Sequence, residues 1–360
     1  MSDNGTRKIE SAVITGATGT IGTALVNLCI SKRIKVIVLA NPASKRLDRI
    51  PQSPYVSVIP CALNELGTER IRGKIEGLLK KNSEKQPTGH FMECAIGQTM
   101  GQTTECAIGQ TAEQRTGGLV FFHLAWAGTY GEARNDYGLQ EDNLRFAIDA
   151  LKLAKSLGCH TFVGAGSQAE YGRVSGVLGP DISCNPENGY GIYKLKAEET
   201  TRKLADELGI VHIWPRVLSV YGPCDGERTM VMSTISKLLS GEVPSLTKGE
   251  QLWDFLFCED AARAFLDLAG QGKSGQVYPL GSGQSRPLRD YIEIIRDEID
   301  PSLELGFGQV SYSDKQVMHL EADISRLTAD TGFVPQVSFR EGIKKTIEWV
   351  RAERNCDNSV

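Results

Sequence analysis

The 360-residue chain has the composition of an ordinary globular protein, with 41% hydrophobic and 23% charged residues. Its 40 basic and 44 acidic residues leave a net charge of −4, which argues against nucleic acid or an anionic membrane as a partner. The sequence has no run of about 18 apolar residues, and residues 1–10 are polar, so neither a membrane span nor a signal peptide is expected.

The nine cysteines are scattered and form no C-x-x-C pair. This pattern suits a reducing compartment and argues against a disulfide framework or a zinc ribbon, so we expect a cytoplasmic protein. The five histidines are isolated from one another, and none has a carboxylate at ligand spacing, so no metal site is predicted.

The first forty residues predict a β-α-β unit. Ser11–Thr15 is a short apolar run typical of a buried strand, and a second strand is expected at 34–39. Between them a G-x-x-G-x-x-G loop leads into a helix at 23–30. Glycines at these places allow a tight turn and the close approach of a pyrophosphate, which the helix N-terminus attracts. The expected cofactor contacts in the loop are Gly16, Thr18, Gly19, Thr20, Ile21 and Gly22.

The end of the second strand bears on the choice between NAD and NADP. An acidic residue there would bind the adenosine ribose, whereas basic residues favour a 2′-phosphate. The segment 39–46 contains no acid, and we expect its Asn41, Lys45 and Arg46 to contact the cofactor. The sequence therefore favours NADP(H), with NAD(H) as the alternative, and a solvated basic turn is the competing structural explanation.

Further strands are expected at Val56–Pro60, at 119–125 and at 159–165. His123 lies inside the second of these apolar runs, where a histidine that packs in the core is more common than a catalytic or metal-binding one. The third run leads directly into Ser167.

Tyr190 and Lys194 follow at the start of a helical run that continues through 195–208. A Tyr and a Lys four residues apart share one helix face, so the ammonium and a nicotinamide ribose are expected to lower the pKa of the phenol. The phenol then serves as a proton donor or acceptor near neutral pH. The hydroxyl of Ser167 is expected to stabilise charge on the same substrate oxygen.

These motifs together resemble the extended short-chain dehydrogenase/reductase proteins, and among them the NAD-dependent epimerase/dehydratase family that acts on nucleotide-sugars. The resemblance covers residues 9 to about 350 and rests on T-G-A-T-G-T-I-G (15–22), H-L-A (123–125), D-N-L (142–144), G-S-Q-A-E-Y-G (166–172), Y-G-I-Y-K (190–194), P-R-V-L-S-V-Y-G-P (215–223) and W-D-F-L-F-C-E-D-A-A-R-A (253–264).

The resemblance implies an α/β fold with a Rossmann-type doubly wound parallel sheet and a smaller C-terminal α/β substrate lobe. The dinucleotide-binding domain is expected at 9–215 and the lobe at 216–350, with some strands and helices shared between them. The implied residues are the catalytic Ser167, Tyr190 and Lys194, Asn143 as support for the proton relay, and Leu124 and Ala125 at the cofactor.

Four departures from the family pattern bear on which reaction is expected. The 4,6-dehydratases have an Asp-Glu pair after the catalytic hydroxyl, and this chain has Gln168 and Ala169, so dehydration is not expected. Ser219 stands where the family commonly has Asn, and Trp253 where it has Arg. The family's Asp near the adenine is replaced around 61–62.

Two reactions remain open, and both use the same Ser, Tyr and Lys. An epimerase retains its NAD, whereas a ketoreductase exchanges NADPH at each turnover, so the absent acid after the second strand favours the reductase. The segment 166–172 also resembles the CDP-abequose and CDP-paratose synthase subgroup, which reduces 4-keto-6-deoxyhexoses. We therefore predict reduction at C4 of a nucleotide-linked sugar, with an epimerase and a non-catalytic NADP-binding regulator or scaffold as alternatives.

The substrate is expected to contact residues from three segments of the chain, at 126–134, at 168 and at 216–253. The loop 127–137 follows a strand at the carboxyl edge of the sheet, although its composition equally fits a solvated loop. Trp253 is suited to stacking on a base or sugar and equally to packing between lobes. A homodimer is a candidate assembly. The expected substrate contacts are Trp126, Tyr130, Arg134, Gln168, Arg216, Ser219 and Trp253.

The segment E-C-A-I-G-Q-T at 93–99 recurs letter for letter at 105–111. Two copies are too few for a solenoid, which needs about three units to bury a core. We therefore interpret the region at about 91–117 as an inserted surface loop rather than as part of the chemistry.

Overall fold

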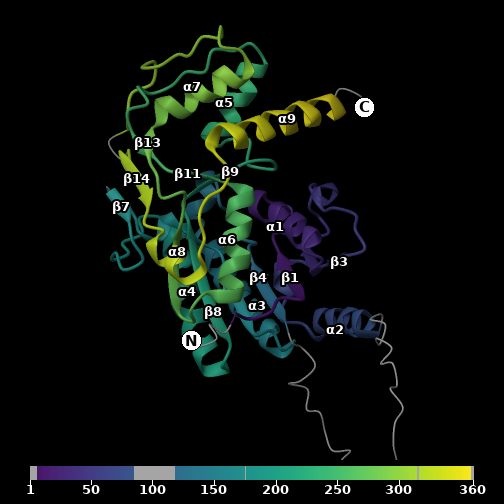
Figure 1. The fold of residues 1–360 in the computed structure, drawn as a ribbon. Coiled ribbons are helices and arrows are strands. Elements are labelled where there is room, and N and C mark those ends of the chain that lie inside the picture. Colours follow the sequence, from purple (N-terminus) through teal and green to yellow (C-terminus); the bar gives the residue numbers. More distant parts are fainter. Residues whose placement is uncertain (1–5, 85–117, 175, 314–315, 358–360) are drawn as a thin grey trace, which may run out of the picture.

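The computed structural model describes residues 6–84, 118–174, 176–313 and 316–357 (Figure 1). The repeated insertion predicted at 91–117 lies outside these residues. Within the described ranges, no helix is both long enough and apolar enough to span a bilayer.

A parallel sheet forms the centre of the molecule, with strand order β12-β8-β5-β4-β1-β2-β3 and the short β6 beside β8. The central strands of the sheet are mostly apolar because both of their faces are covered, as the fully buried Val13 and Phe121 show, whereas the edge strand β3 is partly exposed. The predicted α/β fold is confirmed. The strands are β1 (Ser11–Thr15), β2 (Lys35–Ala40), β3 (Val56–Pro60), β4 (Leu119–His123), β5 (Thr161–Gly164), β6 (Gly166–Ser167), β8 (Val211–Val217) and β12 (Gln276–Leu280).

Helices cover both faces of this sheet (Figure 1). On one face α1 (Thr20–Ser31), α6 (Cys258–Gln271) and α8 (Ser325–Thr331) enclose a core with alternate strand residues such as Ile14. On the other face Val13 packs in the core that α2 and α3 cover. The helices of that face are α2 (Glu69–Glu84), α3 (Tyr137–Ser156) and α4 (Gly189–Leu208).

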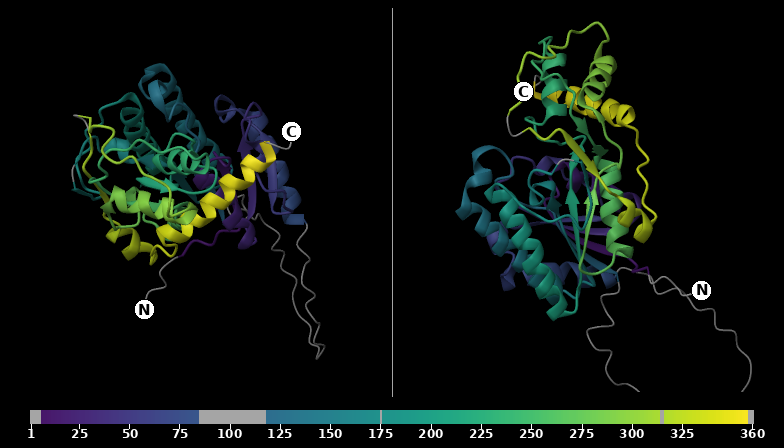
Figure 2. Two further views of the ribbon diagram at one scale, coloured as in Figure 1. Left: turned by 90° about the horizontal axis from the view of Figure 1, so that it is seen from above. Right: turned by 90° about the vertical axis from the view of Figure 1, so that its left-hand side faces the viewer.

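A smaller lobe lies at one end of the large sheet (Figure 2). It contains the sheet β13-β10-β14-β7, and the pair β11-β9 lies between it and the rest. The helices and strands are α5 (Met230–Leu239), α7 (Leu288–Ile299), α9 (Phe339–Asp357), β7 (Gly176–Leu178), β9 (Ser219–Tyr221), β10 (Leu252–Trp253), β11 (Phe255–Phe257), β13 (Arg286–Pro287) and β14 (His319–Ala322).

The chain passes between the two parts more than once. Residue 216, the predicted start of the lobe, falls within β8. Two elements of the predicted lobe belong with the large sheet, because β12 is one of its strands and α6 packs on one of its faces. The strand β12 pairs in parallel with β8, so the intervening chain must cross over and return to the same sheet. The lobe is therefore not one continuous stretch of sequence.

Candidate active site

The glycine loop after β1 packs tightly against the chain that follows β4. Gly16 has φ +77°, and a Cβ on it would lie 2.6 Å from the backbone nitrogen of Ala125. A Cβ on Gly22 would collide with the carbonyl of Gly16. Gly19, by contrast, has open space around it, with the nearest atom 3.6 Å from a built Cβ. The three glycines therefore differ in function. Gly16 and Gly22 permit close packing of the backbone, and Gly19 leaves room for a ligand.

Gly19 is also the N-cap of α1, and no side chain caps this helix end. Its first N–H groups consequently lack intrahelical acceptors and favour an anion. A cavity of about 380 Å³ opens here, and a dinucleotide fits its glycine-lined wall and helix end. Its described lining holds Gly16, Ala17, Thr18, Gly19, Thr20, Leu39, Ala40, Asn41, Ser44, Arg46, Cys61, Leu63, Leu124, Ala125, Trp126, Ala127, Thr129, Tyr130, Cys224 and Gly226.

Five residues predicted to contact the cofactor are not part of this lining, and two of them, Tyr190 and Lys194, are the predicted catalytic residues described below. Ile21 and Gly22 lie inside the first turn of α1, where Gly22 packs beneath Gly16. Lys45 is exposed beside Arg46, and Arg46 alone of this pair lines the cavity. Sequence reasoning missed Ser44 and Thr129, which no motif distinguishes.

Tyr190 and Lys194 both lie in the first two turns of α4, so the predicted shared helix face is present. Asn188 caps the helix by accepting a hydrogen bond from the backbone N–H of Gly191 at 2.9 Å. A Cβ on Gly191 would collide with the carbonyl of Ala169, so the start of α4 packs directly on the turn after Ser167. This contact brings Ser167 within hydrogen-bonding reach of the Tyr190 hydroxyl.

Lys194 is almost fully buried. Its Nζ donates a hydrogen bond to the carbonyl of Ala165 at 2.5 Å and lies 3.9 Å from the centre of the Trp126 ring. Burial lowers the pKa of Lys194 to about 7, although the charge of Glu170 opposes this effect. The predicted substrate contact Trp126 is therefore also a cation–π partner of the lysine.

The groups around Tyr190 both raise and lower its pKa. Burial raises the pKa of Tyr190 above its ordinary value in the protein alone. The Ser167 hydroxyl and the charge of Arg134 lower it. Arg134 lies over the Tyr190 ring, with its guanidinium carbon 4.6 Å from the ring centre, whereas the Lys194 nitrogen lies 5.9 Å away.

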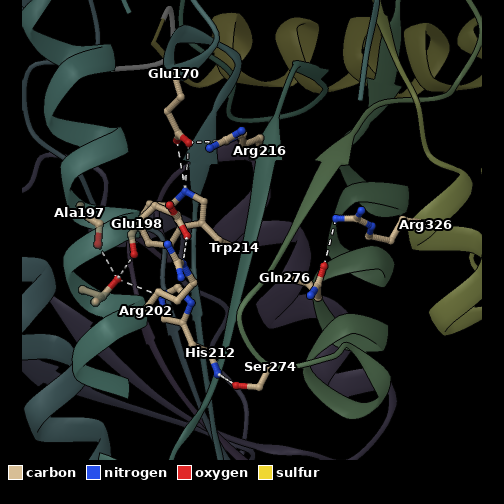
Figure 3. Close-up of polar contacts among 11 residues, drawn as sticks. Glu170, Ala197, Glu198, Arg202, His212, Trp214, Arg216, Ser274, Gln276 and Arg326 are labelled. Atoms are coloured by element: carbon tan, nitrogen blue, oxygen red, sulfur yellow. Dashed lines mark hydrogen bonds and ion pairs between the residues drawn. The ribbon is translucent and has the colours of Figure 1, made fainter. Parts of the chain in front are cut away.

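A buried carboxylate, Glu170, supports Ser167 and also binds Trp214 and Arg216, as Figure 3 shows for the latter two. Glu170 is fully buried and accepts hydrogen bonds from the backbone N–H of Ser167 at 2.7 Å, from Trp214 Nε1 at 3.2 Å and from Arg216 Nε at 2.5 Å. Ser167 and Glu170 form a capping box around the short turn between them. The S-x-x-E spacing at 167–170 signals this arrangement, and sequence reasoning missed it.

Arg216, a predicted substrate contact, is engaged by other side chains of the protein. Arg216 is buried, paired with Glu170 and stacked over the Tyr171 ring at 4.6 Å. Burial opposes its charge, but Glu170 and Tyr171 outweigh burial and raise the pKa of Arg216. The residue lies in the strand β8 beside β6, so it serves the framework of the site.

Asn143 lies in α3 and fixes the backbone rather than the side chains of the site. Its Oδ1 accepts from the Ala127 N–H at 2.9 Å, and its Nδ2 donates to the carbonyls of Ala127 and Leu139, both at 3.0 Å. These bonds hold the loop that follows β4, which includes Trp126. The predicted core position of His123 is confirmed, because its buried ring is hydrogen-bonded to Thr15 at 3.0 Å.

Two further cavities adjoin the catalytic residues. One, of about 340 Å³, is lined by Tyr190, Ser167 and Arg134, and the other, of about 440 Å³, by Ser219 and Trp253. Tyr130 and Gln168 line both, and Tyr130 also lines the cofactor cavity.

Ser219 and Trp253, two of the departures from the family pattern, form a pair. Trp253 Nε1 donates a hydrogen bond to Ser219 Oγ at 2.8 Å. This pair lines the second cavity, and Trp253 also lines the first. No three His, Cys, Asp or Glu side chains gather to hold a metal within the described ranges.

Asp225 is a lining residue that sequence reasoning missed, although it follows the Y-G-P motif at 221–223. Its carboxylate accepts hydrogen bonds from the Gly226 N–H at 2.7 Å and from Thr229 Oγ1 at 2.9 Å. Burial nevertheless raises the pKa of Asp225 to about 6. Compared with the unfolded chain, the folded protein therefore favours the neutral form of Asp225.

This shift predicts a pH-dependent effect of Asp225→Asn on stability. A raised folded-state pKa stabilises the fold fully below about pH 4, and this contribution is lost as the pH rises through about 6. The variant stays neutral, so its stability relative to the parent should increase by about 3 kcal/mol between pH 4 and pH 8. Urea unfolding at both pH values measures the difference.

Asp323→Asn is the matched control, at a carboxyl whose pKa shift has the opposite sign. Hydrogen bonds from Ser325 lower the pKa of Asp323, so its charged form stabilises the fold. The charge of Asp323 stabilises the fold above about pH 4, and this contribution is lost as the pH falls below that value, so between pH 4 and pH 8 this variant should keep a nearly constant stability relative to the parent. Equal pH trends for both variants would contradict the assignment of a buried, destabilised carboxylate to Asp225.

Comparison with known proteins gives several relatives of this chain. The chain is 28% identical over 182 residues to a dTDP-glucose 4,6-dehydratase of Shigella flexneri, a match that covers 49% of this chain and 50% of that protein. It is 27% identical over 202 residues to an Escherichia coli dTDP-4-dehydro-6-deoxyglucose reductase, covering 54% and 63%. The chain thus spans about half to two thirds of the length of these relatives.

A solved structure shares the fold over almost the whole chain. It is a UDP-N-acetylglucosamine 4-epimerase from Methanobrevibacter ruminantium M1 in complex with UDP-N-acetylmuramic acid, with a TM-score of 0.75 and 20% identity over 96% of this chain and 99% of that one. The model of the NAD dependent epimerase/dehydratase family matches residues 12–281, which include the glycine loop, Ser167, Tyr190 and Lys194. Since that match covers most of the chain, the protein belongs to the NAD dependent epimerase/dehydratase family.

Proposed function

We propose that this protein reduces a nucleotide-linked 4-keto-6-deoxyhexose at C4 with NADPH. The observation that carries the proposal is the cofactor cavity at the end of β2, whose described lining has Asn41, Ser44 and Arg46 and no carboxylate. A basic and hydroxyl-bearing wall suits the 2′-phosphate of NADP, whereas NAD is usually held by an acid at this position. NADPH is the usual reductant, so its use favours net reduction.

The residues at the substrate side support reduction over dehydration. Elimination of water needs an acid and a base beside the catalytic hydroxyl, and Gln168 and Ala169 occupy those positions. The amide of Gln168 faces both substrate cavities and binds hydroxyls without exchanging protons. The likeness to a dTDP-4-dehydro-6-deoxyglucose reductase fits the same reaction class.

In this mechanism the protein holds the substrate carbonyl between two hydroxyls. Ser167 and Tyr190 are hydrogen-bonded to each other, so a carbonyl oxygen bound to both is polarised. When bound, the nicotinamide supplies the hydride. Tyr190 gives its proton to the oxygen that gains charge, and Glu170 keeps Ser167 in place through its backbone N–H.

An epimerase that retains its cofactor is the second candidate. The two substrate cavities meet at Tyr130 and Gln168. Together they offer the room that a keto intermediate needs to rotate and present its opposite face to the nicotinamide. The same Ser167 and Tyr190 serve this reaction. The two candidates differ in whether added reductant is consumed.

The test is an NADPH-oxidation assay of the purified protein with CDP-, dTDP-, GDP- and UDP-linked 4-keto-6-deoxyhexoses. We expect stoichiometric oxidation with at least one of them and a 4-hydroxy product. Conversion of a nucleotide-sugar into its epimer without added NADPH, and no oxidation with any keto sugar, would overturn the reductase in favour of the epimerase.

Arg46→Gln tests the cofactor within the same assay. The loss of a charged hydrogen bond to a phosphate costs about 1.5–3 kcal/mol, so the KM for NADPH should rise about 10- to 100-fold while that for NADH stays unchanged. The adjacent Lys45→Gln is the matched control, because Lys45 does not line the cavity. Equal effects of both variants would show that general charge, not a phosphate contact, is responsible.

A further inference from the structure

Two cations lie close to Tyr190, and the nearer one is not the lysine of the Y-x-x-x-K motif. The guanidinium carbon of Arg134 is 4.6 Å from the centre of the Tyr190 ring, and the Lys194 nitrogen is 5.9 Å away. Arg134 comes from the short 3-10 helix at Gly131–Asn135, which no family motif includes.

Arg134 is held firmly in this place. Its Nη1 donates to the carbonyl of Thr129 at 3.4 Å. The helical turn that carries Arg134 packs on the start of α4. The N–H of Gly189 donates a hydrogen bond to Asn135 Oδ1 at 3.2 Å. A Cβ on Gly189 would lie 2.9 Å from the Arg134 carbonyl, so the two backbones are in close contact. Gln140 also binds the carbonyl of Ala133 at 2.9 Å. Arg134 and Tyr190 are therefore parts of one packed unit.

Lys194 has other partners besides Tyr190 in this structure. Its Nζ is engaged by the Ala165 carbonyl and the Trp126 ring, and burial lowers its pKa to about 7. Part of the lysine population is thus neutral near pH 7. A guanidinium remains charged at every pH at which proteins are folded.

The remaining charged groups around Tyr190 do not replace Arg134. From the turn after Ser167, Glu170 faces it but is paired with Arg216. The neutral Tyr130 lies on the loop after β4, and Glu170 and Tyr130 both raise the pKa of Tyr190. At the rim of the same cavity Arg173 and Glu187 form an exposed ion pair of 2.6 Å.

We propose that Arg134 is a positioning residue that stabilises the negative charge left on Tyr190 when its proton passes to the substrate oxygen. The proposal rests on the reductase or epimerase chemistry proposed above. In the step concerned, the O–H bond of Tyr190 breaks and a new O–H bond forms on the substrate. The phenolate then regains a proton from water, and Arg134 stabilises it in the interval.

The first test needs no substrate. Ultraviolet absorbance measures the ionised fraction of Tyr190 at pH 10, as the difference between each protein and the same protein carrying Tyr190→Phe. Arg134→Gln should lower this fraction about tenfold, which corresponds to a rise of about one unit in the pKa. Arg134→Lys should restore most of it, since a lysine retains the charge. Arg173→Gln, which removes another arginine of the same cavity, should leave the fraction unchanged.

The second test uses turnover. Arg134→Gln should lower kcat about tenfold and move the pH profile of kcat upward, and Arg134→Lys should recover both. An unchanged ionised fraction in Arg134→Gln, with an effect confined to KM, would overturn the proposal and leave Arg134 as a substrate contact. A chain that turns over no keto sugar or epimer would instead refute the proposed function, and the absorbance test would still decide the role of Arg134.

Discussion

Tyr190→Phe should lower kcat by about 10²- to 10⁴-fold, the usual contribution of a side chain that transfers a proton in the transition state. The phenylalanine keeps the edge-to-face contact with the Trp126 ring, so the shape of the site is retained. Only the hydroxyl, which is hydrogen-bonded to Ser167, is removed. NADPH oxidation at saturating keto sugar measures the effect, and binding of NADPH followed by fluorescence should be nearly unchanged.

Tyr193→Phe is the matched control for this prediction. Tyr193 lies three residues further along α4, and its ring meets Tyr137 outside the three cavities described above. Its hydroxyl is remote from Ser167, so turnover should stay within about twofold of the parent. Comparable losses in the two variants would refute the assignment of proton transfer to Tyr190.

Glu170→Ala should destabilise the protein by about 3–5 kcal/mol, because it leaves the buried Arg216 without its counter-ion. The variant also removes the acceptor of the Ser167 N–H and of Trp214 Nε1. Turnover should therefore fall even in the fraction that remains folded, since Ser167 loses its support. Urea unfolding measures the first effect and kcat below the unfolding transition measures the second.

Glu187→Ala is the control for the effect of charge. It breaks the exposed ion pair with Arg173 at the rim of the same cavity, and such pairs contribute about 0–1 kcal/mol. The double variant Glu170→Met with Arg216→Met should recover much of the lost stability, because no unpaired charge stays buried. A loss of less than about 1 kcal/mol in Glu170→Ala would contradict a structural ion pair beneath the site.

The motifs of the sequence predicted the parts of the site that lie within one short segment. The glycine loop and the first turn of α1 are such a segment, since the close packing of Gly22 on the carbonyl of Gly16 joins residues only six apart in the chain. The spacing of Tyr190 and Lys194 on α4 is another, because four residues nearly complete a helical turn.

Contacts between distant segments were missed. Arg216 was expected at the substrate, but Glu170 lies 46 residues earlier and meets it only because β6 and β8 pair. Ser219 and Trp253 are 34 residues apart, and neither departure from the family pattern indicated a hydrogen bond between them. The repeated segment at 91–117 remains a prediction, as do the homodimer and the cytoplasmic location.

The sequence by itself determined the parallel α/β fold, the dinucleotide loop and the catalytic Ser167, Tyr190 and Lys194 as candidates. Each of these is encoded in local backbone constraints, such as the steric freedom of glycine and the periods of strand and helix. The tertiary structure alone decided which charges face Tyr190 and which carboxylate supports Ser167. The physical reason is that the charge and solvation of a group depend on everything packed around it, and residues far apart in the chain supply most of those neighbours.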